Sequence, residues 1–334
     1  MGKTKKSDRG YWVSKLFYYQ SVFYGFVYSL RFLSPTFFSA TNPALEYGGM
    51  FDDKKSDVYK LVPNKYLPKM ALADNQMDVS RIMNTGTLSY PLVIKPDIGF
   101  KGYLVLKVND EDQLNKALPK YDDKSILIQE FIDYSKEYSI LIYRYPRSGN
   151  VGVTSFIEKS YPSVRGDGIQ TLKQLIESND NPFLNKEWIK KINMSALDQV
   201  LDVNEERRID HIGNYSRGAR FHSLNHKING DISQWAKHLL DQIEGIDFCR
   251  VDLKANSIED LLAEQFSIIE INGAKSEPLH TYDKRFSYLE IMKDVHRHWM
   301  IVRDIVKERL SMSYRLPSFS EGFKSWRITH NLIK

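Results

Sequence analysis

Two short apolar runs in the last third of the chain carry polar side chains at alternate positions. The first run holds Arg250 and Asp252, and the second holds Glu270 and Asn272. Because side chains of a strand alternate between its two faces, each polar pair shares one face of a predicted strand. The intervening residues are predicted to point into a core: Cys249, Val251, Leu253, Ile269 and Ile271. If the strands are neighbours, two carboxylates, an amide and a guanidinium meet on one polar surface.

That polar surface has the composition of a magnesium site. Asp252, Glu270 and Asn272 offer three oxygen ligands, which suit Mg²⁺, a hard ion often shared with nucleotide phosphates. Arg250 beside them is able to hold a phosphate or a developing oxyanion. The pattern alone equally allows two strands that carry solvated charges.

Earlier in the chain, residues 90–108 predict a strand, a glycine-containing loop and a second strand from Tyr103 onward. Gly99 and Gly102 allow the loop backbone to turn tightly near a ligand, and Lys95 and Lys101 place positive charge beside it. This arrangement is compatible with a loop that holds phosphates, although it matches neither the Walker nor the dinucleotide pattern. A plain glycine hairpin is the alternative interpretation.

The remaining periodicity alternates between strands and helices. It predicts strands at 126–132, 137–144 and 151–158, and helices at 109–118, 171–177, 231–244 and 280–309.

Residues 11–38 are unusually rich in tyrosine and phenylalanine and follow a basic start. A membrane-spanning helix needs about 20 mostly apolar residues, and this run is interrupted by Lys15, Gln20 and Arg31, so we do not expect a span. Packing within the fold or at an interface, including a homodimer, is the favoured interpretation. Contact with a membrane surface is the alternative.

The bulk composition is that of an ordinary globular protein. The 334 residues are 42% hydrophobic and 27% charged, with a net charge of +5 that forms no long basic block. A nucleic-acid partner is therefore not implied, whereas an anionic small molecule is compatible. The single cysteine, Cys249, rules out a disulfide framework within the chain and leads us to expect a reducing cytoplasm.

The order of these segments resembles the ATP-grasp superfamily over roughly residues 50–300. The resemblance implies that the Lys95 strand and its glycine loop form the phosphate-binding lid, that residues 129–132 form the adenine hinge, and that Glu137 binds ribose. It implies that Asp252, Glu270 and Asn272 hold Mg²⁺ and that Arg250 stabilises the reaction intermediate. A second nucleotide-binding lysine is implied at Lys55, with Lys54 an equal alternative by position. The implied ATP-binding set is Lys55, Lys95, Asp97, Gly99, Lys101, Gly102, Gln129, Glu130, Phe131, Ile132 and Glu137.

Within that superfamily, residues 164–168 and 214–218 are similar to segments of carboxylate–amine ligases of the D-alanine:D-alanine ligase, cyanophycin synthetase and glutathione ligase branch. The similarity implies an ATP-dependent enzyme that joins a carboxylate to an amine through an acyl phosphate. An ATP-grasp kinase, or a ligase to a hydroxyl or thiol, is the alternative, and a scaffold without turnover is a third. Four residues are candidates for binding substrate carboxylates, with ordinary surface charge as the competing interpretation: Lys159, Arg217, Arg220 and His280.

The expected fold is therefore α/β (α+β), an ATP-grasp fold with a reduced N-terminal subdomain. We expect that subdomain at 1–85, a small β-rich nucleotide lid at 86–145, a larger catalytic subdomain at 146–310 and a tail at 311–334. The reduced N-terminal subdomain and the Pro278–His280 segment depart from better-known ligases in regions that normally select the substrate.

Overall fold

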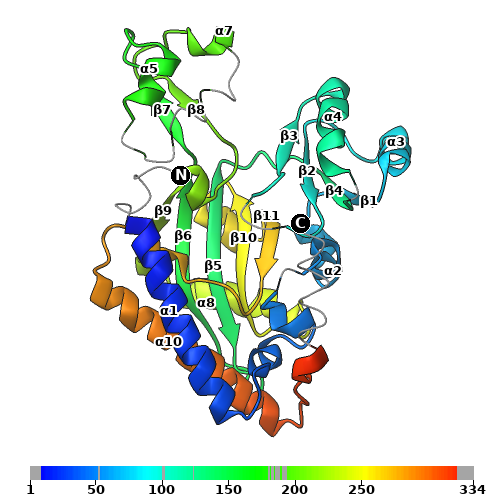
Figure 1. Cartoon of the computed structure of the whole chain (residues 1–334), viewed down its shortest axis with the longest axis vertical. Helices are drawn as coiled ribbons and strands as arrows, with labels where there is room; N and C mark the ends of the chain where they lie inside the picture. The colour runs from blue at the N-terminus through cyan, green and yellow to red at the C-terminus, as the bar shows by residue number, and fades with distance from the viewer. Residues whose placement is uncertain are drawn as a thin grey trace.

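The described residues form helices and strands, and the strands build three sheets, the two larger of which are covered by helices (Figure 1). The mixed helix-and-sheet class predicted from the sequence is confirmed. The computed structural model describes residues 9–321 except for 52, 100–101, 123, 180, 182–183, 185–188 and 190–193.

A four-stranded antiparallel sheet contains the segment predicted to hold phosphates. Its strands lie in the order β1 (Met70–Ala73), β4 (Ile126–Glu130), β2 (Leu92–Pro96) and β3 (Leu106–Val108). Helices α3 (Gln76–Asn84) and α4 (Glu111–Ala117) share an apolar core with it. β3 is shorter than the predicted strand that starts at Tyr103, because Gly102 to Leu104 form a turn in which both end residues have positive φ.

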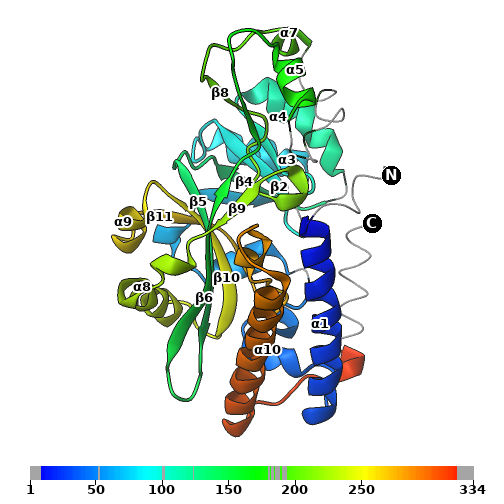
Figure 2. The ribbon, with the colours of Figure 1, turned by 90° about the vertical axis from the view of Figure 1, so that its left-hand side faces the viewer.

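A five-stranded antiparallel sheet forms the centre of the molecule. Its order is β11 (Phe266–Asn272), β10 (Phe248–Ala255), β5 (Lys136–Arg144), β6 (Val151–Ser160) and β9 (Arg220–Ser223). Helices α8 (Gly230–Asp241) and α9 (Ile258–Leu262) cover one face. On the other face lie α10 (Tyr288–Ser311) and, outside it, α1 (Arg9–Arg31) (Figure 2).

Side-chain alternation along β10 matches the sequence prediction. Cys249, Val251 and Leu253 are buried in the core shared with α8, and their neighbours face the opposite side. The prediction for Ile269 was wrong. A register shift in the β10–β11 pairing leaves this residue without a direct partner, and Ile269 turns toward the polar face.

Smaller elements complete the fold. Strands β7 (Ser163–Arg165) and β8 (Glu206–Arg208) pair beside α5 (Leu172–Glu177) and α7 (Met194–Leu197), which enclose a separate small core. Helix α2 (Lys55–Lys60) lies next to the end of β2. Short 3-10 turns are found at Phe37–Thr41, Glu46–Gly49, Asn64–Tyr66, Leu118–Tyr121, Tyr215–Arg217, Asn225–Lys227 and Leu279–Tyr282.

The two long helices begin and end at recognisable signals. The closing helix, predicted from residue 280, begins only at Tyr288, because Ser287 and Glu290 form a capping box that starts it there. α1 ends at Arg31, before a residue with positive φ, Leu33. No helix among the described residues combines the length and the apolar character that a membrane span requires.

Candidate active site

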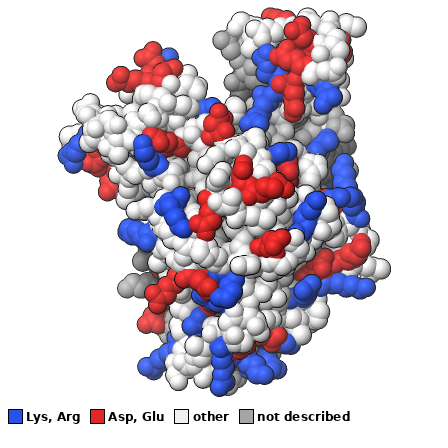
Figure 3. Space-filling model, turned by 180° about the vertical axis from the view of Figure 1, so that it is seen from behind, with Lys and Arg blue, Asp and Glu red and all other residues white. Residues whose placement is uncertain are grey.

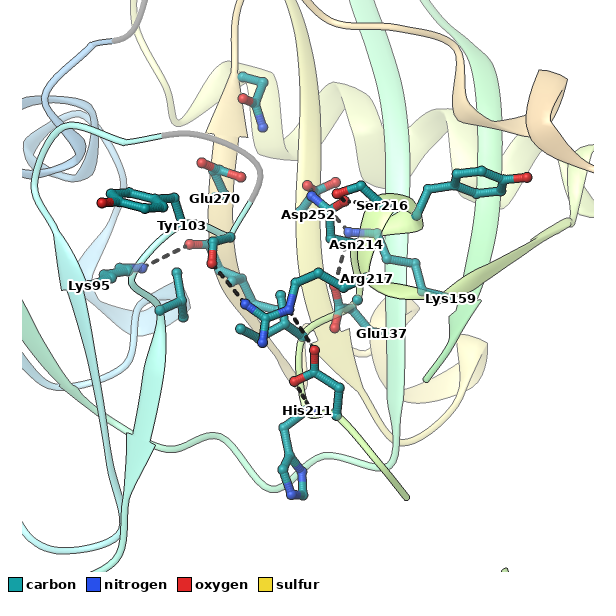
Figure 4. Close-up of a pocket in the computed structure, with 18 of the residues that line it drawn as sticks. Lys95, Tyr103, Glu137, Lys159, His211, Asn214, Ser216, Arg217, Asp252 and Glu270 are labelled. Atoms are coloured by element: carbon teal, nitrogen blue, oxygen red, sulfur yellow. Dashed lines mark hydrogen bonds and ion pairs between the residues drawn. The ribbon is translucent and has the colours of Figure 1, made fainter. Parts of the chain in front are cut away.

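A cavity of about 1220 Å³ lies between the four-stranded sheet and the polar face of the central sheet. Side chains from β2 and β4 line one wall, and those from β10 and β11 line the facing wall. The first turn of α1 also reaches it, through Gly10, Tyr11 and Ser14. Figure 4 shows charged side chains of both signs pointing into this space.

The β10–β11 pairing brings the four organising residues together. Asp252 lies directly opposite Glu270, and Arg250 lies opposite Asn272, so all four occupy one face. Asp252 accepts a hydrogen bond from the Ser139 hydroxyl at 2.5 Å. Burial by itself raises the pKa of Asp252, but the charges of Arg250 and Lys159 and this hydrogen bond outweigh it, so the pKa is lowered. Asp252 therefore stays ionised.

The chemistry of this face fits a hard divalent cation. Two carboxylates and one amide lie on adjacent strand positions, and oxygen ligands of this kind suit Mg²⁺. The Asn272 amide nitrogen is buried, and no described residue accepts a hydrogen bond from it, so the protein does not fix which amide atom faces the cavity. Among the described residues, no group of three or more Asp, Glu, His or Cys side chains is placed to hold a metal ion, so the candidate ligand set includes the Asn272 amide.

Lys95 is a buried cation facing those carboxylates. Its side chain is 4% exposed, and its Nζ donates to the Tyr59 hydroxyl at 2.8 Å and to the Ile269 carbonyl at 3.4 Å. The Tyr59 hydroxyl in turn donates to the same carbonyl. Burial, together with the charge of Lys55, lowers the pKa of Lys95 to about 7.

Of the two alternative lysines, Lys55 lines the cavity and Lys54 does not. The Lys55 ammonium donates to the Gly99 carbonyl at 2.9 Å and lies 4.0 Å from a Glu270 oxygen. Lys55 thus connects the glycine loop to the carboxylate face.

The glycine loop lines the cavity through Gly99 and Gly102, whereas Lys101 lies outside the described residues. Gly102 has a φ of 71°, and its carbonyl accepts a hydrogen bond from Arg217 at 3.0 Å. Asp97 does not line the cavity. It is 3% exposed and accepts hydrogen bonds from the backbone and the hydroxyl of Ser56, each at 2.8 Å, so it holds the start of α2 and does not face the cavity as predicted.

At the predicted adenine hinge, Gln129, Phe131 and Ile132 line the cavity but Glu130 does not. Alternation along β4 turns Glu130 to the other side, where it accepts hydrogen bonds from the backbone and hydroxyl of Ser89. The prediction that the Glu130 carboxylate faces the base is therefore corrected.

Glu137, the predicted ribose ligand, is held from two sides. Lys159 donates to one of its oxygens at 2.9 Å and the Tyr161 hydroxyl donates to the other at 2.6 Å. Lys159 also lies 3.4 Å from Asp252, so this buried lysine connects the two carboxylates, as Figure 4 shows. Lys159 is thus not ordinary surface charge.

The other candidates for binding substrate divide into two groups. Arg217 lines the cavity and pairs with Asp210 at 2.5 Å. Arg220 and His280 do not line it. His280 is 2% exposed and lies 3.0 Å from Asp294, which makes it a packed structural residue; Arg220 lies at the start of the edge strand β9.

Several lining residues were not predicted from the sequence. Lys254 lies two residues after Asp252, so strand alternation could have placed it on the same face as Arg250 and Asp252. Its ammonium donates to the Ile132 carbonyl at 2.9 Å and lies 4.7 Å from the centre of the Phe131 ring. Tyr59 and Tyr161 do not line the cavity, but their hydroxyls contact Lys95 and Glu137, and no local sequence pattern indicates these contacts.

Part of this chain is similar to a known family of proteins. Residues 53–143 match the family described as the RimK-like ATP-grasp domain. A stretch of 67 residues is 33% identical to the coenzyme gamma-F420-2:alpha-L-glutamate ligase of Methanococcus maripaludis, covering 20% of this chain and 24% of that protein.

Solved structures with a similar fold include the VanG D-Ala:D-Ser ligase of Enterococcus faecalis. It has 14% identity and a TM-score of 0.44, with 79% of this chain and 62% of that chain covered. The D-alanine–D-alanine ligase of Bacillus anthracis has 13% identity and a TM-score of 0.44, covering 78% and 70%.

Proposed function

We propose that this chain, which carries a RimK-like ATP-grasp domain in residues 53–143, is an ATP-dependent ligase that joins a carboxylate to an amine. The ATP-grasp resemblance is confirmed by that family match, whereas the activity is our proposal because the chain spans only about a quarter of the curated relative. One observation supports it most: Asp252, Glu270 and Arg250 share one strand face, opposite Lys95 across a single cavity.

The proposed reaction has two steps. A carboxylate is a poor electrophile, so its oxygen first takes the terminal phosphoryl group of ATP and ADP leaves. The amine nitrogen then attacks the acyl phosphate, phosphate leaves and the nitrogen loses a proton. Mg²⁺, when bound by Asp252, Glu270 and Asn272, would neutralise charge on the phosphates.

The chain's own residues supply the positioning. Lys55 and Lys95 place positive charge beside the phosphates from the lid side, and Arg250 offers a guanidinium to the developing oxyanion. Gln129, Phe131 and Ile132 form the wall proposed to bind the base, and Glu137, fixed by Lys159 and Tyr161, is placed for a ribose hydroxyl. Gly99 and Gly102 let the loop backbone approach the phosphates.

The test supplies ATP, Mg²⁺ and hydroxylamine together with a panel of amino acids and small carboxylates. Hydroxylamine traps an acyl phosphate, so we expect hydroxamate and ADP in equal amounts with the right acid. Asp252→Asn is the matched inactive control. ADP without hydroxamate for an acid that stimulates turnover would contradict the ligase proposal and favour phosphoryl transfer to another acceptor.

A further inference from the structure

The side of α1 that points away from α10 and the central sheet is apolar and exposed. We define its outer face as Tyr19, Val22, Phe23, Phe26, Leu30 and, just past the helix end, Leu33. Their exposed fractions run from 54% at Val22 to 92% at Leu33. Contiguous apolar surface of this kind on a protein marks an interaction site.

This outer face is separate from the face that holds α1 in the fold. On the inner side, Val13 and Tyr28 are buried in the core shared with α10. Tyr24 stacks on Trp299 with ring centroids 6.2 Å apart, and its hydroxyl lies 2.5 Å from His296. Figure 2 shows α10 between α1 and the central sheet. The inner contacts alone thus account for the docking of α1, and the aromatic residues outside need another explanation.

The outer face is broad. Tyr18 and Val27, which are 58% and 37% exposed, lie at its two edges. Because they are nine residues apart, their side chains point in roughly opposite directions, and the outer face spans about half of the helix circumference between them. A single partner helix contacts a narrower stripe, with two apolar positions per heptad. A face of this width fits an extended, nearly flat apolar surface.

The charges on α1 are all of one sign. Arg9–Arg31 contains no Asp or Glu, and Lys15 and Arg31 lie toward its two ends. On the opposite side of the molecule, acidic and basic residues are interspersed (Figure 3). Two copies of α1 packed face to face would bring like charges together in either orientation, whereas an anionic surface complements them.

From breadth, composition and charge together we propose that the outer face of α1 binds an anionic lipid surface. The helix would lie in the plane of the membrane, with phenylalanine and leucine side chains among the acyl chains, tyrosine at the headgroups, and Lys15 and Arg31 near lipid phosphates. This inference is independent of the catalytic proposal, because neither the outer face nor its charges line the cavity.

Cosedimentation of the full chain with vesicles tests the inference. We expect binding to vesicles of three parts phosphatidylcholine and one part phosphatidylserine, weaker binding to phosphatidylcholine alone, and a decline as salt is added. The double substitution Phe23→Ser, Phe26→Ser should lower the partition coefficient at least about tenfold, because both side chains leave the apolar layer. Lys15→Glu should weaken binding only where phosphatidylserine is present.

Ile169→Ser is the matched control, since Ile169 is 80% exposed but lies in the loop before α5. Its binding should equal that of the unmodified chain. Absence of vesicle binding at low salt, or equal binding by the phenylalanine double variant, would overturn the inference. A dimer in vesicle-free solution that dissociates on Phe23→Ser, Phe26→Ser would assign the face to a second copy instead. Thermal melting of each variant separates these outcomes from unfolding.

Discussion

At the scale of single residues, each charged side chain of the cavity depends on its neighbours. Lys95 is buried beside Lys55 and keeps a pKa of about 7, well below that of a free lysine. Asp252, equally buried, stays ionised because Arg250 and Lys159 flank it. Burial alone therefore does not predict the charge of a group; the sign of its closest neighbours decides.

Lys95 should make the proposed binding of ATP sensitive to pH. In the free protein its pKa is about 7, so at pH 8 most molecules carry a neutral amine there. Bound phosphates favour the ammonium and raise its pKa, so ATP binding at pH 8 should take up a proton and ATP affinity should fall as pH rises above 7. Calorimetry at pH 8 in two buffers of different ionisation enthalpy measures the uptake. Lys95→Met should abolish it and Lys60→Met, outside the cavity, should not; equal uptake in Lys95→Met would refute the assignment.

Glu270 and Glu130 form a matched pair for testing the carboxylate face. Glu270→Gln should lower ATP turnover by about two orders of magnitude, because it removes one of two carboxylates opposite the phosphates. Glu130→Gln should leave turnover and ATP affinity unchanged, since its side chain lies outside the cavity. Steady-state ADP release measures both, and full turnover in Glu270→Gln would remove that residue from the proposed metal site.

At the scale of elements, alternation along strands predicted much of the site and failed where a strand was irregular. It put Arg250 with Asp252, and Glu270 with Asn272, on one face of each strand, and the pairing of β10 with β11 joins the two pairs on one face of the sheet. Alternation assigned Ile269 to the wrong face of the sheet, because a register shift in the β10–β11 pairing interrupts the period of two. The resemblance of residues 129–132 to an adenine hinge suggested Glu130 as a ligand beside Gln129, whereas alternation turns these adjacent strand residues to opposite faces. The prediction that His280 binds substrate failed for a different reason, because no local sequence pattern distinguishes a buried histidine from an exposed one.

The pairing of β5 with β6 sets Glu137 directly opposite Lys159. Lys159→Met would remove the positive charge that pairs with the buried carboxylates of Glu137 and Asp252. The free energy of unfolding should therefore fall by about 3–5 kcal/mol. Lys136→Met is the control, because the Lys136–Glu158 pair on the same two strands is partly exposed and should contribute about 1 kcal/mol or less. Urea denaturation measures both, and a similar small loss in the two variants would contradict the buried role of Lys159.

At the scale of the whole molecule, the short N-terminal segment supports the catalytic strands. The Asn42 amide nitrogen donates to the carbonyls of Gly48 and Phe248 at 2.7 and 2.9 Å. Its oxygen accepts from the backbone of Asp247 and Phe248. Beyond it, the Gly48 carbonyl accepts a hydrogen bond from Ala274, in the loop after Asn272. Residues 42–49 thus connect the start of β10 to the end of β11. The subdomain boundaries predicted from the sequence stay predictions.

Asn42→Ala removes the four hydrogen bonds of the Asn42 side chain and leaves buried backbone groups without partners. Unfolding free energy should fall by about 3 kcal/mol. Asn84→Ala, at the exposed end of α3, should change it by no more than about 0.5 kcal/mol. Thermal and urea unfolding of both variants measure the difference, and a similar value for the two would show that the N-terminal segment is not a support.

Gly10 lies so close to the ring of Tyr215 that no Cβ fits between them. The first turn of α1 is therefore part of the cavity wall, while the following turns of the same helix carry the exposed aromatic residues. One helix therefore contributes both to the cavity wall and to the exposed face proposed to bind a membrane. If a surface that holds α1 changes the affinity for a ligand in the cavity, that ligand must change the affinity for the surface by the same factor.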